Sequence, residues 1–362
     1  MSRECPVTCG VARHNLLFAG MSKTPSGIKQ IAQRAGVHVS TVSRALNPQT
    51  RTMVSQEVAT RILKIANNLS YTRNPLAFGL KTRRSFTVGV IVPDLTNPLF
   101  PPIVRAIERT LGKEGYVTML ADSDNSRETE SAILDSLRAR QVDGLILATA
   151  WLHDDIVTRC QEQSIPFVLV NRTVLDESVT SVVTNDAYGI RLAVDHLLQL
   201  GHRKLAYVGG PLNTSTATRR REGFIAALKT YRLSVREKLI ADCASFTVQA
   251  GAAAARELLR TANRSFTAIV AANDMLALGC YDALSEAGLA CPNDISITGY
   301  NDMPFADRFN PSLTTLRIPH DQLGVQSSLL LLRKMREPAV TVPSMHLEPV
   351  LVVRGSTAAI QR

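Results

Sequence analysis

The sequence predicts a small all-α unit near the N-terminus, followed by a larger α/β core of two lobes, each built on a parallel sheet. Three observations support this fold class. Residues 27–69 show the helical spacing of apolar residues, positive charge is concentrated in residues 21–84, and strand and helix patterns alternate from Phe86 onward. A chain of 362 residues with 45% hydrophobic content is large enough for two or three domains with separate cores.

Residues 27–47, GIKQIAQRAGVHVSTVSRALN, predict two short helices joined by a turn. The apolar residues of the first helix fall on one face: Ile28, Ile31, Ala32 and Ala35. Gly36 follows, and glycine best tolerates the left-handed conformation that ends a helix. A second helical pattern starts near Val39 or Ser40. Its inward face holds Val42, Ala45 and Leu46. Two such helices form a helix-turn-helix unit.

The outward face of the second helix is polar and carries no carboxylate: Ser40, Thr41, Ser43, Arg44 and Asn47. Small hydroxyls let a helix backbone approach DNA closely and donate hydrogen bonds to phosphates. Arg44 can donate two hydrogen bonds to a guanine in the major groove. The spacing alone also fits an ordinary helical hairpin at a domain edge, so the charge of the surrounding segment matters.

The positive charge of the chain is distributed unevenly. The formal net charge is +10, and residues 21–84 contain eleven lysines and arginines against one acid, Glu57. The rest of the chain is therefore close to neutral. A basic segment on a near-neutral body is the electrostatic footprint of a nucleic-acid-binding protein. A solvated basic tail would lack the helical periodicity found here.

A third helix and a linker complete the N-terminal part. Ser55 can cap the helix, and Glu57 suits the dipole of its first turn. The inward stripe is Val58, Ile62, Ile65, Ala66 and Leu69. Asn74 is a good cap and Pro75 fits a first helical position. Because a helix over Pro75–Lys81 is too short to be stable alone, we expect a linker that becomes helical when docked.

These patterns divide the N-terminal part into a tail or misassigned start at residues 1–24, a helix-turn-helix domain at 25–72 and a linker at 73–85. The apolar patch near the start is too short for a secretory signal, and no apolar run approaches a membrane span. A cytoplasmic protein is therefore expected. The six cysteines lack the paired spacing of a zinc site, so we expect reduced thiols, no metal and no cofactor: Cys5, Cys9, Cys160, Cys243, Cys280 and Cys291.

From Phe86 the chain alternates strands with helices, as parallel sheets wrapped by helices require. The first lobe has four expected strands: FTVGVIVP, YVTMLADS, VDGLILAT and PFVLVN. Its helices are expected at about Pro102–Gly115, Arg127–Arg140 and Asp154–Gln163. The pattern restarts near Thr184. The second lobe has expected strands KLAYVGG, Leu239–Ala244, TAIVAAND and ISITGYND, and expected helices Asp186–Leu200, Arg219–Tyr231, Val248–Arg260 and Met275–Ala287.

The C-terminal part of the core is expected to cross between the lobes. SLTTLRIPHDQLG is interpreted as a crossover, helix Gln322–Arg336 as a return to the first lobe, and MHLEPVLVVRGST as a strand pair on the second. The core thus spans residues 86–357. Lobe 1 takes about 86–184 and 316–340, and lobe 2 takes about 185–315 and 341–357.

Two such lobes form a hinged clamshell with a ligand cleft beyond the carboxyl ends of the strands. Several expected strands end in polar residues there: Asn97, Asn171, Arg172, Asn273, Asp274, Asn301 and Asp302. Capping of loops and helices explains any one of them equally well. For Asp274 and Asp302 we expect the capping role.

At these residues the chain resembles the LacI/GalR family of bacterial transcriptional regulators. AGVHVSTVSRALN is similar to the family signature, and six further segments are close to family patterns: VPDLTNPLF, RQVDGLIL, RREGF, AANDMLALG, TGYND and LVVRGST. The resemblance covers residues 27–357. It implies a helix-turn-helix headpiece, a hinge helix and a two-lobed core like that of periplasmic binding proteins. The implied function is a repressor controlled by a small metabolite such as a sugar or sugar acid.

The resemblance also implies roles for individual residues in DNA binding. Base edges are expected to meet Val39, Ser40 and Arg44. Phosphates are expected to meet Thr41, Ser43 and Asn47. In the hinge, Asn74 and Leu80 are expected at the DNA, with Leu80 as a wedge between base pairs. His38 stands where the family usually has Ser, so either Ser40 caps the recognition helix, the helix frays, or His38 touches a phosphate.

For the effector, the resemblance implies that Arg220 grips the ligand and Phe246 stacks on it. The remaining expected contacts are Leu99, Phe100, Asn171, Arg172, Asn273 and Asn301. Asn301 departs from the Asp frequent in the family, and fewer acids beside Arg172 and Arg220 would suit an anionic effector. The alternative is that Arg220 belongs to an exposed triplet, Arg219–Arg221.

The expected partners are a near-palindromic DNA operator, a small molecule and a second copy of the chain, without a membrane. A solute-binding protein or a DNA-binding protein without an effector is the alternative. An enzyme is not expected, because the chain has no GxSxG, phosphate-loop, HExxH or dinucleotide-binding motif.

Overall fold

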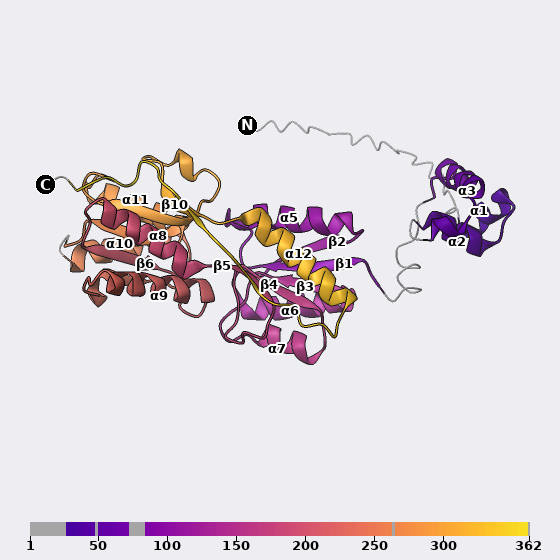
Figure 1. The fold of residues 1–362 in the computed structure, drawn as a ribbon, viewed down its shortest axis with the longest axis horizontal. Coiled ribbons are helices and arrows are strands. Elements are labelled where there is room, and N and C mark those ends of the chain that lie inside the picture. The colour runs from indigo at the N-terminus through magenta and orange to yellow at the C-terminus, as the bar shows by residue number, and fades with distance from the viewer. Residues whose placement is uncertain (1–26, 48–49, 72–83, 263–264, 361–362) are drawn as a thin grey trace, which may run out of the picture. The chain divides into compact units, whose positions relative to one another are not determined.

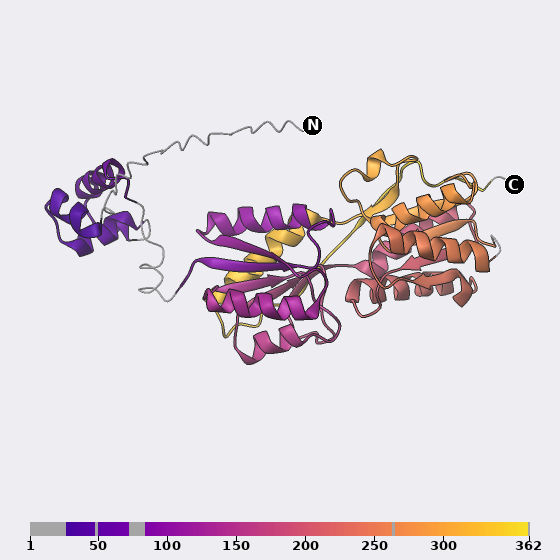
Figure 2. The ribbon, with the colours of Figure 1, turned by 180° about the vertical axis from the view of Figure 1, so that it is seen from behind.

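The computed structural model describes residues 27–47, 50–71, 84–262 and 265–360. The chain divides into two compact units, Met1–Phe78 and Gly79–Arg362. Figures 1 and 2 show both units from opposite sides. Three predictions lie outside the described residues: the tail, the DNA contacts of the hinge residues Asn74 and Leu80, and a helix over Pro75–Lys81.

The first unit is a three-helix domain, as predicted. Its elements are α1 (Ile28–Ala35), α2 (Val39–Leu46), the 3-10 turn η1 (Arg51–Met53) and α3 (Gln56–Asn68). Gly36 ends α1 in the left-handed conformation, with φ 63°. The three stripes meet in one core of buried residues: Ile31, Ala32, Ala35, Val42, Ala45, Ala59, Ile62 and Ala66.

The sequence did not predict how two helix ends of this domain are arranged. Ser55 occupies the cap position of α3, but its side chain makes no capping hydrogen bond. At the C-terminal end of α2, Arg51 Nε donates to the carbonyl of Ala45 at 3.0 Å, and Thr50 Oγ1 donates to the carbonyl of Arg44 at 3.1 Å. The basic loop therefore satisfies carbonyls that a helix end leaves free.

The first lobe of the core contains a six-stranded parallel sheet in the order β11-β5-β4-β3-β1-β2. Its strands are β1 (Thr87–Val92), β2 (Val117–Asp122), β3 (Gly144–Leu147), β4 (Phe167–Val170), β5 (Ser181–Thr184) and β11 (Met345–Leu347). Its helices are α5 (Phe100–Lys113), α6 (Arg127–Ala139), α7 (Asp155–Glu162) and α12 (His320–Arg336). Helices α5 and α12 cover one face, and α6 and α7 the other (Figure 1).

The second lobe repeats this architecture with the strand order β12-β10-β9-β8-β6-β7, where only the β10–β12 pair is antiparallel. Its strands are β6 (Leu205–Gly209), β7 (Ile240–Asp242), β8 (Ala268–Ala271), β9 (Ser296–Asn301), β10 (Thr314–Arg317) and β12 (Val350–Val352). Its helices are α8 (Asp186–Gln199), α9 (Ser215–Thr230), α10 (Val248–Thr261) and α11 (Asp274–Glu286). Helices α8 and α9 pack together, as do α10 and α11.

The C-terminal strands differ from the prediction. They were expected as a pair on the second lobe, but Met345 of β11 pairs with Val182 of β5 in the first lobe, and only β12 joins the second. The predicted crossover contains β10, so the second lobe extends to Arg317. Short apolar segments such as MHL and VLV fit either sheet, and the free edge available to each one decides the pairing.

The chain consequently crosses between the lobes three times within the described residues, after β5, after β10 and between β11 and β12. Helix α9 also begins four residues earlier than expected. Thr214 caps it by accepting a hydrogen bond from the amide of Ala217. The earlier start places Thr216 in the first turn, at the carboxyl end of the neighbouring strands.

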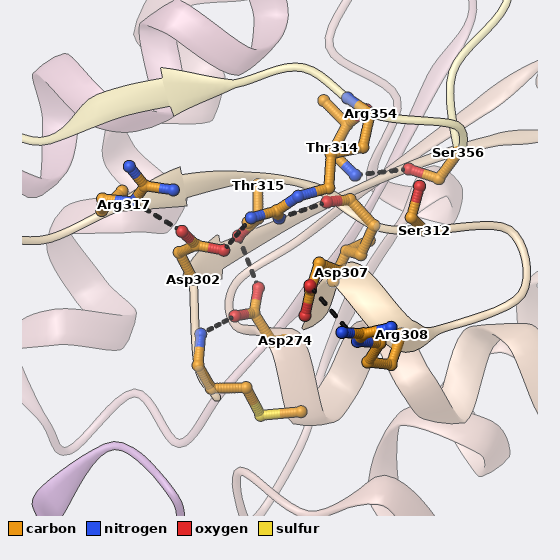
Figure 3. A network of polar contacts seen from close by, with 12 residues as sticks. Asp274, Asp302, Asp307, Arg308, Ser312, Thr314, Thr315, Arg317, Arg354 and Ser356 are labelled. Carbon is orange, nitrogen blue, oxygen red and sulfur yellow. Dashed lines mark hydrogen bonds and ion pairs between the residues drawn. The ribbon is translucent and has the colours of Figure 1, made fainter. Parts of the chain in front are cut away.

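A polar network holds the second crossing to the rest of the second lobe (Figure 3). Asp302 forms ion pairs with Arg317 Nε at 2.6 Å and with Arg354 Nη2 at 2.7 Å. Beside it, Asp274 accepts from Thr315 Oγ1 at 2.5 Å and from the amide of Met303 at 2.7 Å. The network therefore fixes the turn after β9 against β10 and the C-terminal segment.

Replacement of the Asp302 carboxylate should destabilise the core. Asp302→Asn keeps the size and tolerates the left-handed φ of 52° at this position, but leaves the largely buried Arg354 guanidinium without its carboxylate. We expect the free energy of unfolding, measured in urea, to fall by about 2 kcal/mol. Asp307→Asn is the control, because its ion pair with Arg308 is exposed, and should change stability by less than about 0.5 kcal/mol. Equal effects would contradict the role of the network.

Candidate nucleic-acid interface and ligand cleft

The polar face predicted for the second helix is presented by α2. Val42 and Ala45 are buried in the headpiece core, while Ser40 and Arg44 are exposed. The other polar residues of this face, Thr41, Ser43 and Asn47, are half-buried. Val39, expected at base edges, is half-buried and packs against the headpiece core. Arg44 is thus the exposed basic side chain of α2.

His38 itself caps α2, so the expectation that Ser40 would cap the helix, or that the helix would fray without a cap, is wrong. Its Nδ1 accepts a hydrogen bond from the amide of Ser40 at 3.2 Å and lies 2.8 Å from Ser40 Oγ. Because Nδ1 accepts, a neutral ring carries its proton on Nε2. The imidazole therefore substitutes for the Ser cap, and the Ser40 hydroxyl is held against it.

The second candidate site is a cavity between the two lobes of the core. All eight residues expected at the effector line it: Leu99, Phe100, Asn171, Arg172, Arg220, Phe246, Asn273 and Asn301. Asn97 and Thr216 complete the lining. The cavity measures about 20 Å³, room for roughly one water. A ligand larger than a water therefore requires this cavity to widen.

A larger hollow of about 960 Å³ lies elsewhere on the core, lined by residues such as Arg109, Phe305 and Pro319. It is open to solvent, and its lining shares no residue with the cavity between the lobes. The cavity between the lobes is the candidate ligand site, because several buried polar side chains converge on it.

Arg220 is buried, so the alternative of an exposed arginine triplet is wrong for this residue. Its Nε donates to Asp186 Oδ1 at 2.8 Å, and its Nη1 donates to the carbonyl of Ala272 at 2.7 Å. The guanidinium carbon lies 3.8 Å from the ring centroid of Tyr300. Burial disfavours the charged form, but the Asp186 carboxylate together with Tyr300 and Tyr207 outweighs this, and the pKa of Arg220 is raised. Asp186 is thus an acid beside Arg220 that the sequence analysis did not identify.

Arg172 is also buried but is held differently. Its Nη1 donates to the carbonyl of Thr149 at 3.3 Å, and it makes no ion pair with a carboxylate of the described residues. Burial lowers the pKa of Arg172 to about 10, and Glu130 and Arg220 act on it in opposite directions. Glu130 is itself buried and accepts a hydrogen bond from Thr149 Oγ1. Burial raises the pKa of Glu130 to about 7.

The three asparagines of the cavity are not equivalent. Asn273 Oδ1 caps α11 by accepting from the amide of Leu276 at 2.9 Å, so capping accounts for its oxygen. Asn171 and Asn301 adopt positive φ angles of 66° and 113°. Their Oδ1 atoms are buried and have no hydrogen-bond partner within the described parts of the chain. Because buried acceptors are normally satisfied, these two oxygens are free for a ligand.

Asp274 and Asp302 are structural residues of the network described above and do not line the cavity. Burial raises the pKa of Asp274 to about 7, against hydrogen bonds from Thr315 and Met303 that lower it. The sequence reasoning missed Asp186 and Thr216. The Ser/Thr-rich segment before Arg219 was a signal for Thr216, whereas nothing in the sequence paired Asp186 with Arg220.

No described helix is long and apolar enough to cross a membrane. The described residues also contain no group of three or more His, Cys, Asp or Glu side chains placed to hold a metal ion.

Two family models match the chain. Residues 27–74 match the model for bacterial regulatory proteins of the lacI family, and residues 85–347 match the model for periplasmic binding proteins and the sugar binding domain of the LacI family. The second match alone covers more than half of the chain.

Curated relatives align over nearly their whole length. The ribose operon repressor of Escherichia coli K12 is 31% identical over 334 residues, which cover 91% of this chain and 99% of the relative. The transcriptional repressor CytR of the same organism is 31% identical over 343 residues, which cover 94% and 99%.

Solved structures show the same architecture. The lac repressor dimer bound to operator and the anti-inducer ONPF superimposes with a TM-score of 0.80 at 26% identity, covering 92% of this chain and all of that one. A LacI family transcriptional regulator from Enterococcus faecium with bound ribose gives a TM-score of 0.67 at 35% identity, covering 76% of this chain and all of that one.

The raised pKa of Asp274 predicts a pH dependence of stability. Since its folded-state pKa of about 7 lies above the ordinary value of 3.8, the folded state holds a proton between about pH 4 and 7 that the unfolded state has released. As the pH rises from about 4 to 7, the free energy of unfolding should therefore fall by up to about 1.4 kcal/mol per pH unit. Glu130 adds a change of the same sign.

Asp274→Asn should flatten this slope in urea unfolding measured at several pH values. Asp282→Asn, on the same helix, controls for the loss of one carboxylate. Its free energy of unfolding should depend on pH as steeply as that of the parent protein. If the Asp274 variant keeps the parent slope, the buried carboxyl does not titrate as described.

Proposed function

Because the chain belongs to the LacI family of bacterial regulatory proteins, we propose that it is a cytoplasmic homodimeric repressor whose operator binding is controlled by a small hydroxylated ligand held between the lobes. The observation that carries this proposal is the convergence of eight expected residues on one cavity with two unsatisfied carbonyl oxygens. Ribose in the Enterococcus faecium relative supports a sugar-like ligand.

The proposed DNA contacts are made by α2. Arg44 reads a base edge, with Ser40 and Val39 beside it, and the hydroxyls of Thr41 and Ser43 donate to phosphates. In a dimer, two such helices would enter successive major grooves of a near-palindromic site. The basic segment around α2 supplies the salt-dependent part of the affinity.

The proposed control runs through the lobes. Asn171 of the first lobe and Asn301 of the second line one cavity, and the Oδ1 atom of each has no hydrogen-bond partner among the described residues. A ligand that donates to both would therefore bridge the lobes and favour one arrangement of them. Three crossings let the lobes move as hinged bodies. Ligand binding and DNA binding are then two sites coupled through an open and a closed state.

The experiment that tests the proposal is a thermal-shift screen of sugars, sugar acids, nucleosides and phosphorylated intermediates on the purified protein. A ligand at 100 times its Kd should add about 2.7 kcal/mol of stability. Each hit is then added to the protein bound to DNA from its own promoter region, with affinity followed by fluorescence anisotropy. Operator affinity that no stabilising compound alters would refute the sensing function and leave DNA binding standing.

Arg44→Ala should weaken specific binding. We expect the loss of about 1–3 kcal/mol of binding free energy and a relaxed preference at one base pair, because a bidentate guanine contact is lost. Lys64→Ala removes the same charge from α3 and should weaken specific and non-specific binding alike. Anisotropy titrations on operator and scrambled DNA measure both. If both variants lose operator affinity and scrambled-DNA affinity to the same extent, Arg44 does not read a base.

A second variant tests the cavity. Arg220→Ala alone would leave the buried Asp186 carboxylate unpaired, at about 3–5 kcal/mol, so Arg220→Met is combined with Asp186→Asn to remove both charges. We expect the double variant to bind operator with parental affinity and to ignore the ligand. Loss of operator binding by a folded double variant would contradict the assignment of Arg220 to the ligand site.

A further inference from the structure

We infer that the ligand of this cavity carries an anionic group, a carboxylate or a phosphate, in addition to its hydroxyls. This inference rests on the proposed function of the same site and narrows its ligand class. It follows from the charges that the cavity contains and from the partners that each charged group already has.

The lining of the cavity holds two guanidinium groups and no carboxylate. Arg220 is neutralised by its buried ion pair with Asp186, 2.8 Å long, and is further held by a carbonyl and an aromatic ring. Arg220 therefore does not need an anionic group of the ligand to balance its charge. The charge balance of the cavity is decided by Arg172.

Arg172 is a buried cation that the described part of the protein satisfies only in part. A guanidinium has five N–H donors, and the hydrogen bond that holds it runs to the Thr149 carbonyl at 3.3 Å. The Trp151 ring lies 5.9 Å from its guanidinium carbon, near the limit of a cation–π contact. A guanidinium with further N–H donors to place can donate two parallel hydrogen bonds to a carboxylate or a phosphate.

The charge of Glu130 acts on Arg172, but the two side chains form no ion pair with each other. Its carboxyl accepts from Thr149 and is oriented by that hydroxyl. It lines a neighbouring hollow beside Trp151 and Asp154, outside the cavity between the lobes. A ligand anion would thus meet Arg172 from the cavity side without displacing an existing ion pair.

The two unsatisfied asparagine oxygens define the rest of the ligand. Asn171 and Asn301 both require donors, and a carboxylate or phosphate has none to give. Hydroxyl groups supply them. Phe100 and Phe246 add apolar surface to the lining, as suits the C–H face of a sugar. The combination points to a hydroxylated acid or a sugar phosphate, with the anion directed at Arg172.

The test uses matched sets of ligands on the full-length protein: an aldose, the aldonate of the same carbon skeleton and its terminal phosphate ester, for pentoses and hexoses. Affinities are measured by isothermal titration calorimetry. In the set that binds, we expect an anionic member to bind about 10- to 100-fold more tightly than the neutral sugar, as charged hydrogen bonds do. The tighter of the two anions tells a carboxylate from a phosphate.

Variants of Arg172 separate ligand recognition from a structural role. Arg172→Gln should remove the preference for the anion while changing the affinity for the neutral sugar less than about threefold, and Arg172→Lys should restore part of the preference because it keeps the charge. Arg138→Gln, an exposed arginine of the same lobe, is the matched control and should keep the parent preference.

Three results would overturn the inference. Tighter binding of the neutral sugar would leave the proposed function intact and remove the anion. Equal weakening of neutral and anionic ligands by Arg172→Gln would show that Arg172 is structural. Failure of every set to bind, while a neutral compound of the thermal-shift screen binds, would overturn the inference and leave the sensing function standing.

Discussion

The buried ion pair between Arg220 and Asp186 is the interaction on which the ligand cleft depends. Asp186 opens α8 directly after the first crossing between the lobes, and Arg220 lies on α9. The same guanidinium reaches the carbonyl of Ala272 after β8 and the ring of Tyr300 in β9. One side chain thus joins two helices and two strands at the edge where the cavity lies. Breaking such a pair leaves a buried charge, so the geometry is strongly constrained.

Parallel sheets explain why so many polar groups meet at this edge. Strands that run in one direction end on one side, and the loops that follow them carry Asn171 and Asn273 to the same cavity. Two of the asparagines have left-handed backbones. The network of Asp274 and Asp302 holds the turn that follows Asn301, the last residue of β9 (Figure 3). Recognition is therefore supported by residues that do not line the cavity.

The headpiece depends on a different balance. Its core is small and made of eight buried apolar residues, so the ends of its helices matter more than in the larger lobes. His38 caps α2 through its imidazole, and Arg51 closes the other end of the same helix. Both residues serve a structural purpose in a segment whose charge first indicated DNA binding. The exposed face of α2 is left to Ser40 and Arg44.

The sequence by itself determined the three-helix headpiece, the two α/β lobes and the polar residues at the strand ends, because periodicity and strand-end chemistry are local properties of the chain. The places of Arg220 and Phe246 at the cavity were expected only from the resemblance to the LacI/GalR family. Tertiary structure alone decided that β11 joins the first sheet and that Asp186 pairs with Arg220. It also decided that the side-chain oxygen of Asn273 caps α11. Those outcomes join residues far apart in the chain or choose between equally good local partners. Only the packing of the whole core brings the competing groups within reach and selects one arrangement.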